Sequence, residues 1–197
     1  MITPKLRSEM EQNIADICRQ LFLTTAIPEM CQKKGAPKQL EFLQEALALE
    51  IQKRDQNKRE RLVKRARFPV FKTFAGYEYG NVQLPPALSR QDLEEAAFVE
   101  KKENLVLYGP VGVGKTHMGI AAGVVACQKG YKTRFYTVTE LVLKLSEARK
   151  NGTLERLQND LNNLDLLILT SGDMFRSTAM DPSFCFGSSQ TAMRVRA

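Results

Sequence analysis

Residues 109–116, Gly-Pro-Val-Gly-Val-Gly-Lys-Thr, constrain the fold of this chain more than any other part of its sequence. They match the pattern Gly-x-x-x-x-Gly-Lys-Ser/Thr, whose glycines let the backbone turn so that successive N–H groups point at phosphate oxygens. Residues 104–108, Asn-Leu-Val-Leu-Tyr, predict a short buried strand before the loop, and a helix is expected to begin at Lys115. The helix N-terminus adds partial positive charge at the same place. This context favours a phosphate-binding loop over a glycine-rich turn with a chance lysine.

The residue types in the loop indicate how a nucleotide is held. The ammonium group of Lys115 is expected to reach the β- and γ-phosphates, and the Thr116 hydroxyl is expected to be a Mg²⁺ ligand. We therefore predict ATP and Mg²⁺ as cofactors. The predicted cofactor-binding residues are Gly109, Pro110, Val111, Gly112, Val113, Gly114, Lys115, Thr116 and His117.

The composition is that of a globular chain with a basic bias. Its 197 residues are 43% hydrophobic and 26% charged, with a formal net charge of +7. This length allows one domain with a sizeable core and an appendage. The positive charge suggests an acidic partner, with nucleic acid as the leading candidate.

The cysteines, the lone histidine and the apolar runs argue against zinc-binding, disulfide-rich, secreted and membrane-spanning classes of protein. Four scattered cysteines form no Cys-x-x-Cys pair and His117 adjoins the loop, so we expect neither a zinc site nor a disulfide framework. The N-terminus has no apolar signal core, and the longest apolar run, residues 120–127, is too short to span a bilayer. These features predict a cytoplasmic chain without a membrane partner.

Residues 52–67 carry most of the excess charge, with eight basic residues against Asp55 and Glu60. A helix that is polar on all sides is typically a solvated one. The alternative is contact with DNA phosphates, which would be independent of base sequence and sensitive to salt. The residues alone favour neither interpretation. The candidate DNA-binding residues are Lys53, Arg54, Lys58, Arg59, Arg61, Lys64, Arg65 and Arg67.

Periodicity and turn residues predict the other elements. Residues 5–34 and a longer segment from Pro37 have apolar residues at helical spacing. An aromatic-rich linker, of the kind that fixes a segment to a core, precedes a capped helix over residues 89–100. Strands are expected at 104–108, 132–137 and 164–169, alternating with helices at 115–129, 139–150 and 154–161. This alternation predicts a parallel sheet covered by helices on both faces.

With these motifs in hand, the chain resembles the IstB-like transposition helper ATPases, relatives of DnaC-type helicase loaders within the AAA+ group. The resemblance covers roughly residues 5–169. It is carried by Lys-Arg-Ala-Arg-Phe-Pro at 64–69, Leu-Tyr-Gly-Pro-Val-Gly-Val-Gly-Lys-Thr-His at 107–117, Gly-Tyr-Lys-Thr-Arg-Phe at 130–135, Thr-Glu-Leu-Val at 139–142, Asn-Gly-Thr-Leu at 151–154 and Leu-Asp-Leu-Leu-Ile-Leu at 164–169.

The resemblance implies an α/β fold of the P-loop NTPase (AAA+) type, with strand order 5-1-4-3-2, preceded by a small all-α module. It implies a helical DNA- and partner-contacting module over 1–67, a linker with a lead-in helix over 68–103 and a partial ATPase core over 104–169. The remaining residues, 170–197, are a tail outside the resemblance. The resemblance also implies self-association on DNA and a cognate transposase as partner, and it favours the phosphate-contact interpretation of residues 52–67.

The sequence departs from the family after Leu169. The family places Asp-Glu there, the Walker B acids that support Mg²⁺ and orient the attacking water; Thr170 and Ser171 stand in those positions. The tail is rich in Ser and Thr, has no strand or helix period and is expected to be disordered. Our hypothesis is that the tail is family sequence read in a shifted frame, because back-translation one base earlier yields a segment that begins Asp-Glu. The gene's nucleotide sequence tests this.

These departures leave three functional interpretations open. The first is a truncated ATP-binding helper of insertion-sequence transposition, deficient in hydrolysis, with a DnaC-like helicase loader as its variant. The second is a passive DNA-binding fragment formed by the N-terminal helices. The third is a non-functional product of a decayed mobile element. In all three, the strand between the loop strand and the strand at 164–169 is expected to be missing, so that both flanking edges lack backbone partners.

Overall fold

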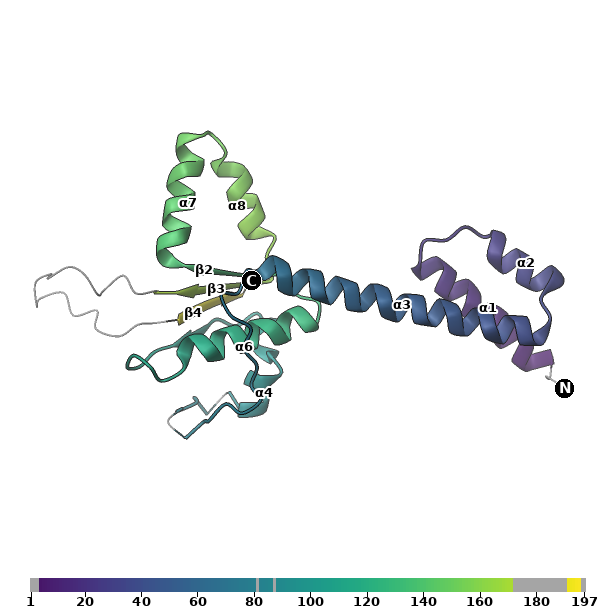
Figure 1. The fold of residues 1–197 in the computed structure, drawn as a ribbon, viewed down its shortest axis with the longest axis horizontal. Helices are drawn as coiled ribbons and strands as arrows, with labels where there is room; N and C mark the ends of the chain where they lie inside the picture. The colour runs from purple at the N-terminus through teal and green to yellow at the C-terminus, as the bar shows by residue number, and fades with distance from the viewer. Residues whose placement is uncertain (1–3, 81, 87, 172–190, 196–197) are drawn as a thin grey trace, which may run out of the picture. The chain divides into compact units, whose positions relative to one another are not determined.

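The computed structural model describes residues 4–80, 82–86, 88–171 and 191–195. The chain divides into two compact units, Met1–Lys58 and Arg59–Ala197, whose elements are shown in Figure 1. Helix α3 (Pro37–Ala66) contributes residues to both units. The expected α/β fold, with helices flanking a sheet and a helical N-terminal module before it, is confirmed.

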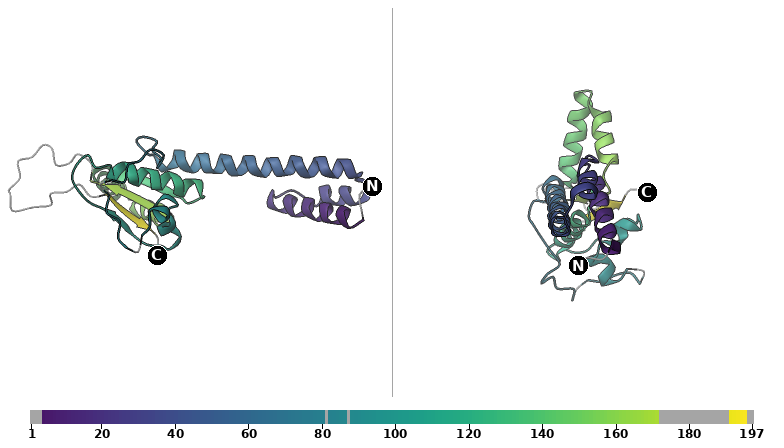
Figure 2. Two further views of the ribbon diagram at one scale, coloured as in Figure 1. Left: turned by 90° about the horizontal axis from the view of Figure 1, so that it is seen from below. Right: turned by 90° about the vertical axis from the view of Figure 1, so that its right-hand side faces the viewer.

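The first unit is a helical module with its own core. Helices α1 (Pro4–Gln20) and α2 (Ala26–Lys34) lie beside the N-terminal half of α3 in Figures 1 and 2. The apolar spacing in the sequence predicts this packing, since residues three and four apart share one helix face. The buried residues of this core are Met10, Ile14, Cys18, Cys31 and Leu40.

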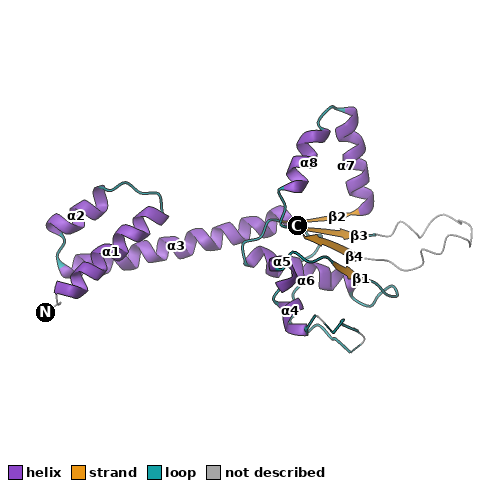
Figure 3. Cartoon of the chain, turned by 180° about the vertical axis from the view of Figure 1, so that it is seen from behind, coloured by secondary structure: helices purple, strands orange, loops and turns teal. Residues whose placement is uncertain are grey.

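The second unit contains a four-stranded sheet of order β1-β4-β3-β2, visible as a fan in Figure 3. Strands β2 (Thr133–Thr137) and β3 (Leu166–Thr170) pair in parallel. Strand β4 (Thr191–Val195) pairs antiparallel with both β3 and β1 (Leu105–Leu107). The sheet is therefore mixed.

Strand β4 corrects two expectations from the sequence. The gap between β1 and β3 was expected to be empty, and the tail was expected to have no strand, yet β4 occupies that gap. Its backbone pairs with Leu105–Leu107 on one side and Leu166–Thr170 on the other. The physical reason is that the inner edges of β1 and β3 would otherwise leave N–H and C=O groups unpaired. Residues 172–190 and 196–197 of the predicted tail lie outside the described residues.

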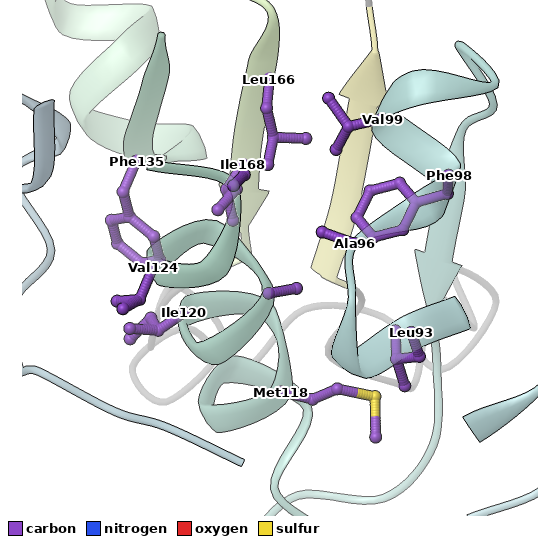
Figure 4. Packing of buried hydrophobic residues seen from close by; sticks show 12 residues of the cluster. Leu93, Ala96, Phe98, Val99, Met118, Ile120, Val124, Phe135, Leu166 and Ile168 are labelled. Atoms are coloured by element: carbon purple, nitrogen blue, oxygen red, sulfur yellow. The ribbon is translucent and has the colours of Figure 1, made fainter. Parts of the chain in front are cut away.

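Helix α6 (Lys115–Gln128) covers one face of this sheet. Alternate residues of β3, Leu166 and Ile168, are fully buried against it, because successive side chains of a strand point to opposite faces. Figure 4 shows Ile168 above α6 and Leu166 pointing toward Val99, with Phe98 and Leu93 closing the core from the side. Each such apolar side chain stabilises the fold by roughly 1.5–3 kcal/mol.

The opposite face is less covered than the sequence predicted. Val106 of β1 is 53% exposed, and Leu167 and Leu169 of β3 are half-buried. Helices α7 (Val138–Lys150) and α8 (Leu154–Asn162) form a hairpin that stands away from the sheet in Figures 1 and 3. The expectation of β1 as a fully buried strand is therefore wrong, and this face is covered less than the sequence predicted in the part of the chain that the structure describes.

The aromatic linker packs against the main core, as predicted. Phe68, Phe74, Tyr77 and Tyr79 all contact the main core, whereas Phe71 is 60% exposed. The linker leads to α4 (Arg90–Glu94), whose N-terminus carries the expected capping box between Ser89 and Asp92. The single helix predicted over residues 89–100 is interrupted.

The interruption lies at Ala96, whose φ of 51° is left-handed and separates α4 from α5 (Ala97–Glu100). This break in the helix allows Leu93, Ala96 and Phe98 all to be buried in the core. Tertiary packing overrides helix propensity here.

Candidate functional site

The loop between β1 and α6 has the backbone that the glycine spacing predicts. Gly109, Gly112 and Gly114 have φ values of 143°, 88° and 86°, a region that residues with a Cβ seldom adopt. Gly114 is also the N-cap of α6, so the loop ends at a helix N-terminus. N–H groups and a helix dipole directed at one place favour an anion there.

Lys115, the first residue of α6, is turned back onto this loop. Its side chain is only 9% exposed, and its Nζ donates to the carbonyl oxygens of Gly109 at 3.0 Å and Pro110 at 2.6 Å. A buried ammonium needs partners, and here its partners are loop carbonyls. The positive charge therefore lies within the turn where phosphate oxygens are expected.

Thr116 is exposed at the first turn of α6, beside Lys115. The residues present fit the phosphates of a nucleotide, because the loop offers N–H donors, an ammonium group and a helix N-terminus. They fit Mg²⁺ less completely, since that cation prefers oxygen ligands that include carboxylates. Among the described residues, no group of three His, Cys, Asp or Glu side chains is arranged to hold a metal.

The end of β3 carries hydroxyls where a metal-supporting acid would be required. Thr170 is the last residue of β3 and is 8% exposed, and the Oγ of Ser171 is buried without a hydrogen-bond partner. A neutral hydroxyl can neither match the charge of a cation nor act as the base that orients water. The geometry thus supports phosphate binding more strongly than phosphate transfer.

A cavity of about 320 Å³ adjoins the loop. One wall is the loop and the start of α6, with Gly112, Val113, Gly114 and His117. The other wall is the linker, with Gly76, Tyr77, Glu78, Gly80 and Val82. This volume is at the lower end of the range of small-molecule pockets. The sequence did not assign these linker residues to a site; glycines at 76 and 80 around two tyrosines were the available signal.

Two contacts hold the linker against the loop. The Tyr77 hydroxyl donates to the Val113 carbonyl at 3.4 Å, and His117 Nε2 lies 2.8 Å from the Thr73 carbonyl oxygen. The Tyr77 and His117 rings meet edge to face with centroids 5.1 Å apart. Gly114 admits the Tyr77 ring, because a Cβ at that position would lie 2.9 Å from the Tyr77 hydroxyl.

The predicted DNA-binding residues lie on α3 or directly after it, and all are exposed. At about 100° of rotation per residue, six of them share one face of the helix: Lys53, Arg54, Lys58, Arg61, Lys64 and Arg65. Arg59 lies on the opposite side, with Leu62 and Ala66, and Arg67 follows the helix with a φ of 57°.

Arg54 also makes structural contacts within the first unit. Its guanidinium pairs with Glu50 at 2.7 Å and donates to the Leu21 carbonyl at 3.1 Å, just beyond the end of α1. At the other end of the basic segment, Arg134 of β2 donates to the Arg65 carbonyl in the last turn of α3. These two arginines hold α3 to its neighbours, so Arg54 is a weaker candidate for DNA than the sequence suggested.

No helix among the described residues is long and apolar enough to cross a membrane.

The sequence comparisons match residues 20–174 to the model of a family described as IstB-like ATP binding protein. A putative ATP-binding protein of insertion sequence IS21 from Pseudomonas aeruginosa is 37% identical over 147 residues, which are 72% of this chain and 54% of the relative.

Two further relatives have similar descriptions. The putative ATP-binding protein of insertion sequence IS5376 from Geobacillus stearothermophilus is 30% identical over 159 residues, 75% of this chain and 61% of the relative. That of insertion sequence IS232 from Bacillus thuringiensis is 32% identical over 123 residues, 61% of this chain and 48% of the relative. The chain thus spans about half the length of the relatives that it matches.

Proposed function

Because the chain belongs to the family of IstB-like ATP-binding proteins, we propose that it is an ATP-binding helper of insertion-sequence transposition. The observation that carries this proposal is the convergence of Lys115, the glycine turns and the α6 N-terminus on one anion site. The family description and the relatives' names support it at the level of an insertion-sequence ATP-binding role.

The residues of the loop would bind the nucleotide as follows. Backbone N–H groups of residues 111–116 donate to the phosphate oxygens, as the glycines with positive φ permit. The Lys115 ammonium exchanges the carbonyls of Gly109 and Pro110 for phosphate oxygens, which are the stronger partners because they carry charge. Thr116 offers its hydroxyl to Mg²⁺, and the bound metal would supply neutralisation of phosphate charge.

We propose further that this chain hydrolyses ATP poorly. Thr170 and Ser171 follow β3 in place of two carboxylates, and neither hydroxyl can orient or deprotonate water as a carboxylate does. The chain then holds ATP as a ligand and does not turn it over.

The test combines binding and turnover on the full chain. Titration with ATP and Mg²⁺ is expected to show saturable binding that the Lys115→Ala variant loses. Phosphate release by the wild-type chain is expected to be no faster than release by that variant. Turnover that depends on Lys115 would contradict the hydrolysis proposal, and binding that is indifferent to Lys115 would contradict the site.

We also propose that the basic face of α3 contacts DNA phosphates. Charge complementarity supports this, because five cationic side chains besides Arg54 are exposed along one face of a single helix. A second candidate function, passive DNA binding without ATP, is favoured by the separate core of the first unit. Self-association, a cognate transposase and a cytoplasmic location stay predictions.

A further inference from the structure

The cavity beside the loop depends on the linker being held against α6. Its two walls come from segments far apart in sequence, residues 76–82 and residues 112–117. Among the described residues, His117 and Tyr77 make the side-chain hydrogen bonds that join the linker to the loop and the start of α6. The position of the linker wall therefore depends on these two side chains.

His117 is placed to act through the linker and not on the phosphates. It is the third residue of α6, two positions after Lys115, and its ring points to the Thr73 carbonyl at 2.8 Å. A carbonyl oxygen only accepts hydrogen bonds, so Nε2 must carry the proton and donate. The same ring packs against Tyr77, whose hydroxyl returns to Val113 in the loop. These contacts join α6 to the linker, and the linker in turn to the loop.

We propose that His117 is a positioning residue for the nucleoside: it fixes the linker so that the adjoining cavity accepts the base and ribose while the loop holds the phosphates. This inference rests on the proposed function, because it assigns the cavity to the same nucleotide. The lining of glycine backbone with Tyr77 and Val82 offers polar groups and apolar surface, which suits a flat heterocycle joined to a sugar.

The two halves of the ligand can be tested separately with the full chain and Mg²⁺. ATP carries a nucleoside and a triphosphate, whereas tripolyphosphate carries only the second part. If the cavity takes the nucleoside, the wild-type chain binds ATP more tightly than tripolyphosphate. His117→Ala then weakens ATP binding by roughly tenfold, about the worth of one hydrogen bond and its packing, and leaves tripolyphosphate binding within about twofold of wild type.

Two conservative variants guard against a simple loss of structure. His117→Gln keeps an N–H donor that can reach the Thr73 carbonyl and is expected to recover part of the ATP affinity. Tyr77→Phe keeps the ring but removes the hydrogen bond to Val113, and it is expected to weaken ATP binding without weakening tripolyphosphate binding. Thermal unfolding of each variant shows whether the chain is folded, and Lys129→Ala, at the far end of α6, is the control.

The outcomes separate this inference from the function on which it rests. If His117→Ala and Tyr77→Phe weaken both ligands equally, or change neither, the positioning role is rejected while ATP binding stands. If the wild-type chain binds ATP no better than tripolyphosphate, the cavity does not take the nucleoside. If Lys115→Ala binds ATP as well as wild type does, the nucleotide site itself is rejected, and the positioning role with it.

Discussion

The Lys115 ammonium nitrogen lies 2.6 Å from the Pro110 carbonyl oxygen, inside the loop that should hold a phosphate. A charged donor at that distance from a carbonyl makes a strong hydrogen bond, and the second bond, to Gly109, holds the turn from the same side. Two carbonyl groups of the loop thus accept hydrogen bonds from the lysine of the same motif. Phosphate binding then replaces hydrogen bonds that already exist, so Lys115 affects both the shape of the loop and its affinity.

Lys115→Met keeps most of the length of the side chain and removes the charge. We expect ATP binding to weaken at least tenfold, because a charge-assisted hydrogen bond contributes about 1.5–3 kcal/mol. We expect the stability of the chain without nucleotide to change by less than about 1 kcal/mol, since the Pro110 carbonyl can turn to water. Isothermal titration and thermal unfolding measure the two quantities.

Lys129→Met is the matched control. Lys129 follows the other end of α6 and pairs with Glu100 at 3.2 Å on the surface. Exposed pairs of this kind contribute about 0–1 kcal/mol. A similar loss of ATP affinity in both variants would mean that net charge, and not the loop, determines binding.

Gly123→Ala is expected to destabilise the second unit. A Cβ at this position would lie 2.5 Å from Ile168 Cδ1 and 2.9 Å from the Phe68 ring, and both side chains are part of the main core. Overpacking costs about 1–3 kcal/mol, which exceeds the gain of up to about 1 kcal/mol in helix propensity. Chemical denaturation measures the free energy of unfolding.

Gly80→Ala serves as the comparison, because no heavy atom lies within 4 Å of its added Cβ. Its effect on the free energy of unfolding is expected to stay within about 0.5 kcal/mol, as for other surface changes. A Gly123→Ala chain as stable as this control would show that α6 does not approach β3 as closely as the structure indicates.

The basic face of α3 predicts a measurable change in the salt dependence of DNA binding. The triple variant of Lys58, Lys64 and Arg65 to Ala is expected to flatten the slope of log affinity against log salt by about 0.9 for each phosphate that is no longer neutralised. Fluorescence anisotropy with a duplex of arbitrary sequence, at several salt concentrations, measures this slope.

A control with the same reduction in charge replaces Lys33, Lys34 and Arg59 with Ala. The two lysines end α2, and Arg59 lies on the opposite side of α3 from the basic face. We expect this control to bind DNA with nearly the wild-type slope. Equal effects of the two triple variants would show that overall charge alone attracts DNA.

Tyr79 makes the fold sensitive to alkali. Burial, reinforced by the nearby Glu94, raises the pKa of Tyr79 to about 12, above the usual value of about 10. The fold favours the neutral phenol, so this contribution to stability is complete below about pH 10 and is lost as the pH rises towards 12. Tyr79→Phe is expected to lose less stability than wild type over this window.

Urea denaturation between pH 9 and 12 measures this difference. Tyr108→Phe provides the reference, because Tyr108 is 77% exposed, and it is expected to follow the wild-type chain. If Tyr79→Phe and wild type lose stability in parallel, another group governs alkaline unfolding.

Local elements were predicted well because local spacing determines them. The strand, glycine turns and helix around Lys115 follow from residues that are neighbours in sequence, and the capping box at Ser89 and the helix ends at Gly130 and Gly152 follow in the same way. The contacts that join the linker to the loop were not predicted. Nothing in the spacing of Thr73, Tyr77 and His117 indicates that they meet, because the meeting depends on how the linker folds over α6.

The sequence by itself determined the candidate anion site, since a glycine turn at a helix N-terminus with a lysine favours phosphate through its N–H groups and its positive charge. It also determined that hydroxyls, and not carboxylates, follow β3 at Thr170 and Ser171. Only the tertiary structure decided the rest. Lys115 bonds its own loop, a cavity forms beside it, and β4 fills the gap between β1 and β3. These features arise because buried donors, acceptors and strand edges must find partners wherever the folded chain supplies them.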